Sequence, residues 1–168
     1  MAYIDSGILL GAPRLKILDT DYTTVLKTLY LPYPDKEGGV VLTETPAKNL
    51  KQALLGGGVR YIGGGVRHNL TLTYGLYDPL YFSKQTGKTV GTADGNVPEL
   101  LGLFDAISTY NSGRLSISPC TNQEIWFRVA CTSDLTRQTT YPAGFGNLNL
   151  TFEGLDCFAY SSSTTVIG

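Results

Sequence analysis

The chain has 168 residues, only 16% of them charged, and its formal net charge at pH 7 is −1. This length suits one domain around a single core, whereas the charged fraction is below the ~25% of ordinary soluble domains and favours burial of surface between subunits. The near-neutral balance lacks the basic excess that binding to a nucleic-acid backbone requires, and no apolar run approaches the ~18 residues that span a bilayer.

The cysteines and the N-terminus indicate the compartment. Cys120, Cys131 and Cys157 are odd in number and widely spaced, and the chain has a single histidine, so the sequence lacks the usual zinc-ligand patterns. Buried free thiols in a reducing compartment are the simplest interpretation. Residues 1–13 lack the basic region and the apolar core of a signal peptide. We therefore expect a soluble protein made in the cytoplasm, with no metal and no cofactor.

The first third of the chain predicts strands. Residues 14–17 alternate basic and apolar side chains, residues 22–30 are rich in Thr, Val, Leu and Tyr, and the Asp19-Thr20-Asp21 turn between them predicts a strand pair. Residues 40–43 predict a further extended segment after a polar turn. Residues 45–55 fit either a short helix or an irregular loop.

Two triple glycines, seven residues apart, are each followed by Val and Arg. Glycine is favoured where the backbone turns with positive φ or passes close to another chain. The second triplet, residues 63–65, predicts the closure of a hairpin, and residues 66–74 predict a long strand whose apolar side chains alternate with polar ones. Arg60 and Arg67, which follow the triplets, suit either contact with a neighbouring subunit or ordinary solvation.

A single helix is expected, near residues 97–111. Before it, residues 75–95 are aromatic and turn-rich and predict a long excursion of the kind that is usually functional or ordered by a partner. Asn96 can cap the helix, Pro98 fits its first turn, and Gly113 supplies a left-handed stop. The apolar positions that share one helical face are Leu100, Leu103, Phe104, Ile107 and Tyr110.

Three later segments, residues 115–118, 125–131 and 147–153, alternate apolar and polar side chains and predict half-buried strands. The narrow apolar face of the helix can be covered only by the sheet that surrounds it in sequence. We therefore predict a mainly β fold, a β-sandwich with one packed α-helix, in a single domain of residues 1–155. Residues 156–168 contain a Ser- and Thr-rich run and predict a flexible or partner-bound tail.

Residues that carry chemistry in enzymes form no pattern here. Gly87-Lys88-Thr89 resembles the end of a phosphate-binding loop, but the position where that loop requires its first glycine is Phe82. His68 lies in the inward row of its strand, which favours a core or interface histidine over a catalytic base, and the carboxylates are scattered. We expect no catalytic residue, while a small hydrolase that pairs one of the cysteines with His68 stays as a third hypothesis.

Four segments have the order and pattern of a known family. They are Gly63-Gly64-Gly65-Val66-Arg67 leading into Leu70-Thr71-Leu72-Thr73, residues 100–117, Ile125-Trp126-Phe127-Arg128-Val129, and residues 147–153. This arrangement resembles the tube-like domain of tailed-bacteriophage tail proteins, which include minor tail proteins and distal tail, or tail-tip adaptor, proteins. The resemblance covers residues 56–155 and is one of pattern.

The resemblance implies a tail-tube-like β-sandwich in a structural virion protein, a ring-forming subunit that usually assembles as a hexamer around the channel through which DNA leaves. Such a subunit binds copies of itself and other phage tail proteins; DNA passes without being specifically bound, and neither a membrane nor a small-molecule substrate is involved. Ring closure needs two different surfaces on each subunit. The candidate interface residues, taken from the hairpin, the excursion and the tail, are Gly63, Gly64, Gly65, Arg60, Arg67, Tyr77, Tyr81, Phe82 and Tyr160.

A tyrosine-rich β-sandwich also fits a carbohydrate-binding module that recognises host glycans. Sugars stack on exposed aromatic rings, and Tyr77, Tyr81 and Tyr141 are candidates for that role. Exposed aromatic rings on a monomer or trimer that binds sugar would favour this alternative. The same rings buried between identical subunits would favour the ring.

Overall fold

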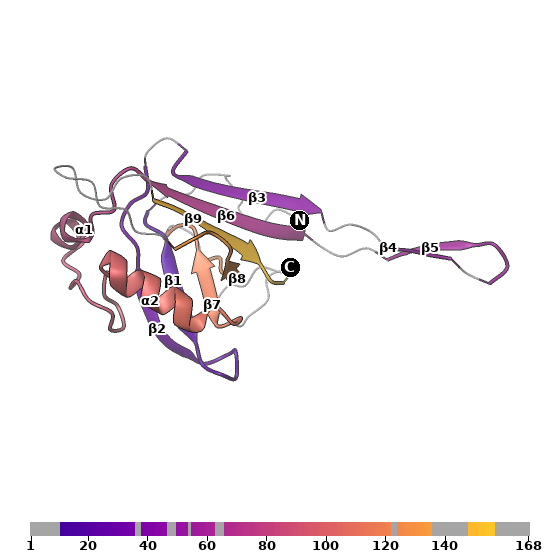
Figure 1. Cartoon of the computed structure of the whole chain (residues 1–168), viewed down its shortest axis with the longest axis horizontal. Coiled ribbons are helices and arrows are strands. Elements are labelled where there is room, and N and C mark those ends of the chain that lie inside the picture. Colours follow the sequence, from indigo (N-terminus) through magenta and orange to yellow (C-terminus); the bar gives the residue numbers. More distant parts are fainter. Residues whose placement is uncertain are drawn as a thin grey trace.

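The computed structural model describes residues 11–35, 38–46, 50–53, 55–62, 66–121, 124–135 and 148–156. Seven strands form one antiparallel sheet in the order β2-β1-β7-β8-β9-β6-β3, and the other two strands pair with each other (Figure 1). The predicted mainly β fold with a packed helix is confirmed. The elements are β1 (Arg14–Leu18), β2 (Val25–Tyr30), β3 (Val40–Pro46), β4 (Leu50–Ala53), β5 (Val59–Ile62), β6 (Val66–Tyr74), α1 (Pro79–Thr86), α2 (Leu100–Tyr110), β7 (Leu115–Ser118), β8 (Phe127–Cys131) and β9 (Leu148–Gly154).

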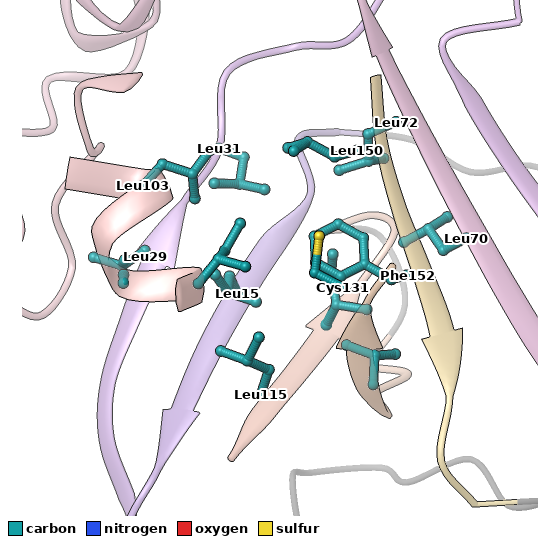
Figure 2. Close-up of a cluster of buried hydrophobic side chains, with 14 of the residues drawn as sticks. Leu15, Leu29, Leu31, Leu70, Leu72, Leu103, Leu115, Cys131, Leu150 and Phe152 are labelled. Carbon is teal, nitrogen blue, oxygen red and sulfur yellow. The ribbon is translucent and has the colours of Figure 1, made fainter. Parts of the chain in front are cut away.

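The main core lies between α2 and one face of the seven-stranded sheet. Alternate side chains of β6, β8 and β9 are buried, as the sequence pattern predicts. Because α2 buries Leu103 and Ile107 against the same cluster, helix and sheet share one core. Figure 2 shows its centre, where side chains from β1, β2, α2 and the later strands converge, among them Leu15, Leu29, Leu103, Leu115, Cys131, Leu150 and Phe152.

The opposite face of the sheet is also covered near β7. Both Ser116 and Trp126 are fully buried. The side chains on both faces of β7 are therefore buried, whereas the sequence predicts a strand with only one buried face. The Arg14 guanidinium and the Lys16 ammonium lie 4.8 and 3.9 Å from the Trp126 ring centroid. The indole donates a 2.6 Å hydrogen bond to Glu124 Oε1. Burial lowers the pKa of Lys16, although the Glu124 charge opposes this change.

Two buried tyrosine hydroxyls tie the end of β6 to distant segments. Tyr74 donates to the carbonyl of Pro32, and Tyr77 donates to the carbonyl of Pro98, each at 2.7 Å. The two rings meet edge to face, with their centroids 5.3 Å apart. Burial raises the pKa of both hydroxyls, which therefore remain donors at all physiological pH values.

Helix α2 begins later than the sequence predicts. Its N-cap is Glu99, whose side chain makes no capping hydrogen bond. The predicted cap, Asn96, instead accepts the backbone N–H of Tyr30 through its carbonyl at 3.0 Å, so this stretch serves the edge of β2. The helix ends at Tyr110 after eleven residues, about three turns, rather than the expected four. Gly113 beyond it has the predicted left-handed conformation, with φ of 93°.

The excursion predicted after β6 contains a second helix, α1, so the expectation of a single helix is wrong. Asp78 Oδ1 accepts the N–H of Tyr81 at 3.0 Å, Pro79 occupies the first turn, and Gly87 ends the helix with φ of 73°. The sequence contains these start and stop signals. The eight-residue helix buries only Phe82, so it lacks the apolar periodicity that identifies α2.

The hairpin of the first half differs from the predicted one. Residues 45–55 include the end of β3 and all of β4, which pairs with β5 from Leu50↔Ile62 to Ala53↔Val59. Gly56 and Gly57 turn this hairpin with φ of 97° and 87°. The prediction that residues 63–65 close a hairpin is wrong, because the flanking β5 and β6 pair with other strands. Residues 63–65 themselves lie outside the described residues.

Removing the buried Tyr77 hydroxyl should destabilise the fold. Tyr77→Phe leaves the Pro98 carbonyl without its donor, which should lower the free energy of unfolding by about 1 kcal/mol. Urea denaturation followed by circular dichroism measures this change. Tyr81→Phe is the matched control, because that side chain is exposed and should change stability by less than about 0.5 kcal/mol. Equal effects of the two substitutions would contradict the structural role of the Tyr77 hydroxyl.

Candidate functional site: a projecting hairpin and an apolar pocket

The β4–β5 hairpin extends away from the seven-stranded sheet, at the opposite end of the molecule from α1 (Figure 1). Neither of its strands joins that sheet. At the tip Leu55 is fully exposed, and the three glycines that follow it are exposed as well. An isolated two-stranded hairpin is only marginally stable in water. Contact with another surface would increase the stability of this hairpin. The hairpin therefore has the form of an arm that projects from the body of the molecule.

The sequence of the hairpin and its flanks is basic. Residues 46–67 contain Lys48, Lys51, Arg60 and Arg67 and no Asp or Glu. The sequence thus combines an apolar residue at the tip with an excess of basic residues in the segment as a whole. A complementary partner surface is apolar where it receives the tip and negatively charged at its rim.

The two edge strands of the main sheet differ in whether other described residues hydrogen-bond to them. At the β2 edge, Asp94 Oδ1 accepts the backbone N–H of Thr28 at 2.7 Å, and the Thr28 carbonyl accepts the N–H of Gly95 at 2.8 Å. At the β3 edge, no described residue provides a comparable cover, and Val41 on that strand is exposed. An uncovered edge strand is a template for pairing with another chain. The β3 edge continues directly toward the projecting hairpin.

An apolar pocket of about 330 Å³ lies beside the N-terminal end of α1. Phe82 is buried there, and its ring meets that of Tyr33 edge to face, with the centroids 4.9 Å apart. Leu76 and Tyr81 are each more than half exposed, and nearby Leu80 adds further apolar surface. The residues that line the pocket are Pro32, Tyr33, Leu76, Asp78, Tyr81 and Phe82. A contiguous patch of this kind is typical of an interaction site.

Negative charge stands at the rim of the pocket. Asp78 belongs to the lining and uses Oδ1 to cap α1. Asp35 lies next to it in the fold, since its Oδ1 accepts the backbone N–H of Gly75, the residue before Leu76. The only basic residue of α1, Lys84, is in the last turn, away from the capped end. The pocket therefore combines an apolar interior with the Asp78 carboxylate, and Asp35 is bound to the residue before Leu76 in the lining.

The sequence-predicted interface residues are distributed unevenly. Tyr81 and Phe82 come together at the pocket, Arg67 is exposed on β6, and Tyr77 is buried and hydrogen-bonded, so its ring is not available to a sugar or a partner. The backbone of Arg60 lies in β5 opposite Gln52. The candidates outside the described residues are Gly63, Gly64, Gly65 and Tyr160, together with Tyr141 and the tail beyond Asp156.

Sequence reasoning missed Leu55, Tyr33 and Leu76. Leu55 lies in an apolar stretch, and only the register of β4 and β5 reveals that it occupies the tip. Tyr33 lies before the β3 strand and Leu76 after β6, so only the fold brings them to one pocket. The sequence signal nearest to the pocket is the Asp78-Pro79 pair, which predicts the start of a helix at this point.

His68 is used for packing in the core of the sheet. It is buried, and its ring stacks on that of Phe127, with the centroids 4.4 Å apart and the planes inclined by 28°. Its Nε2 lies 3.6 Å from Glu44 Oε1. Burial lowers the pKa of His68 below the ordinary 6.5. Cys131 is buried on β8, which β9 separates from the strand of His68, and its Sγ contacts the Ser133 hydroxyl at 3.4 Å.

The described residues contain neither a candidate metal-binding cluster nor a helix that could cross a membrane. No three His, Cys, Asp or Glu side chains in those ranges gather closely enough to hold a metal ion. None of the helices formed there has the length and apolar character needed to cross a membrane. The hairpin and the α1 pocket are therefore the features of the described chain on which a functional interpretation rests.

The buried histidine predicts acid sensitivity. Since the pKa of His68 is lowered in the folded state, its contribution to stability is complete above pH 6.5 and is lost as the pH falls, because the unfolded chain binds the proton first. Wild-type unfolding free energy, measured with urea between about pH 7.5 and 5.5, should decrease toward acid. His68→Gln should show a shallower decrease, whereas Glu44→Gln, which keeps the imidazole, should retain it. An unchanged slope in His68→Gln would contradict this assignment.

Comparisons with known proteins add no assignment to this geometry. The chain matches no protein-family model and no curated protein sequence. A functional interpretation therefore depends on the hairpin, on the β3 edge, which no described residue covers, and on the α1 pocket. Features of these kinds are common on surfaces that bind another macromolecule.

Proposed function

We propose that this protein is a structural subunit of a tailed-phage tail, which assembles with copies of itself into a ring at the tail tip or along the tail tube. The observation that carries the proposal is the β4–β5 hairpin, which projects from the body and joins no strand of the main sheet. The order of the strands and of α2 supports it through the resemblance to tube-like tail domains. The protein is then made in the host cytoplasm and incorporated in the virion.

A projecting arm at one end of the subunit favours head-to-tail assembly. The arm and the surface that receives it are different, so a pair of subunits still has one unbound arm and one unbound receiving surface. Closure into a ring occupies both of these surfaces. The β3 edge, which no described residue covers, adds backbone groups that a neighbouring chain can pair with. The low charged fraction of the chain agrees with extensive burial between subunits.

The charge of the chain suits a wall along which DNA passes. With a net charge of −1, a ring of such subunits lacks the basic excess that would hold the phosphate backbone. In this proposal the four basic residues of the hairpin segment are used for contact between subunits. Other tail proteins would then bind the two faces of the ring.

Deletion of the hairpin tests the proposal. Light scattering after size exclusion should show the wild type as an oligomer, and negative-stain images of the same fraction should show rings with an open centre. A variant that joins residue 49 directly to residue 63 should be monomeric.

The deletion variant also provides its own control. Because β4 and β5 join no strand of the main sheet, the variant should unfold in a single transition at a temperature close to that of the wild type. A variant that is folded and still forms rings would contradict the role of the hairpin, and a monomeric wild type would contradict the ring.

A carbohydrate-binding module is the second candidate, because Tyr33 and Tyr81 present exposed rings beside the Asp78 carboxylate. Such rings stack on sugars, and carboxylates accept sugar hydroxyls. A glycan screen followed by titration tests this function, with Tyr33→Ala and Tyr81→Ala as variants. Saturable binding to a monomer that both substitutions abolish would favour this function over the ring.

A further inference from the structure

We propose that the tip of the β4–β5 hairpin, with Leu55 at its end, docks into the α1 pocket of a neighbouring copy of the same chain. This inference deepens the proposed function, on which it rests for the identity of the partner as a second copy. It names the two surfaces that meet. The contact is heterologous, because the hairpin of one subunit meets the pocket of the next.

The two surfaces lie at opposite ends of the molecule. The hairpin and α1 are separated along its long axis (Figure 1). The seven-stranded sheet, which is paired continuously from β2 to β3, lies between them. In this arrangement the contact forms between copies, and its repetition generates a ring or a filament.

The shapes and the polarity of the two surfaces match. Leu55 is fully exposed at the end of a narrow two-stranded turn, and the pocket encloses about 330 Å³ between aromatic and aliphatic side chains. Apolar cavities of about 150 Å³ accept a molecule the size of benzene, so the pocket has room for a leucine side chain and part of the turn. The adjacent Gly56 and Gly57 have no side chains that would obstruct entry.

The charges of the two surfaces are opposite. The hairpin segment, residues 46–67, carries four basic residues and no acidic residue. The receiving end carries Asp78 in the pocket lining and Asp35 beside it. Opposite charges at the rim of an apolar contact steer association and fix the register of the partners. This complementarity identifies a second copy as the occupant that the chain itself supplies.

Cysteine cross-linking tests the contact directly. Leu55→Cys and Tyr81→Cys are purified separately, each with Cys157→Ser, since the described native cysteines Cys120 and Cys131 are buried. When the two variants are mixed and treated with a short bis-maleimide, a covalent dimer that joins positions 55 and 81 should form, and peptide mass spectrometry identifies it. Leu26→Cys is the matched control for Tyr81→Cys, because it is similarly exposed but lies on β2.

An association measurement gives the second readout. Leu55→Asp should weaken assembly about tenfold or more, because it removes an apolar anchor and places a carboxylate against Asp78. Leu26→Asp, at an exposed site outside the pocket, should leave the association constant within about twofold. Both variants should keep the wild-type unfolding temperature, because both side chains are exposed.

The outcomes separate this inference from the function on which it rests. A wild type that forms rings, with no link between positions 55 and 81 and no effect of Leu55→Asp, overturns the docking contact and leaves the ring proposal standing. A wild type that stays monomeric up to its solubility limit overturns both. Saturable sugar binding in the pocket of the assembled ring also overturns the docking contact, because the hairpin tip would fill that space.

Discussion

The limited stability of a two-stranded β-hairpin in water is the constraint on which this interpretation depends. The seven-stranded sheet and α2 bury their apolar side chains in a shared core. Among the described strands, β4 and β5 pair only with each other, and they lie at one end of the molecule. The chain can therefore be described as a body with one core and an arm outside that core. In the proposed assembly, a neighbouring copy covers the arm.

The body is asymmetric in a way that suits such assembly. Its β2 edge is covered by the backbone and side chains that precede α2, including Asp94 and Gly95, while no described residue covers the β3 edge. Helix α1 and the hairpin lie at opposite ends of the molecule (Figure 1), and the pocket is lined in part by residues of α1. The proposed assembly uses these two different ends in a heterologous contact, which forms a ring where the rotation between subunits closes.

The strands and the core could be predicted from the sequence because they follow local periodicity. The alternation in β6 and β9 and the apolar face of α2 each have a pattern that burial enforces. The sequence predicts a hairpin turn at the second glycine triplet, residues 63–65, whereas the structure has it at Gly56 and Gly57. Either triplet can form a turn, and only the pairing of β4 with β5 selects the first. The pocket could not be predicted, since it joins Tyr33, Leu76 and Phe82 from separate segments. Phe82 and Tyr81 were identified as interface candidates, but buried Tyr77 shows that composition does not determine exposure.

A reconstruction of the native assembly by cryo-electron microscopy tests the central claim most directly, because it shows both the symmetry and the path of the hairpin. We expect a closed ring of subunits related by rotation, with each β4–β5 hairpin lying on the next subunit and an open channel at the centre. A monomer, a two-fold symmetric dimer, or a ring whose hairpins extend freely into solvent would contradict it.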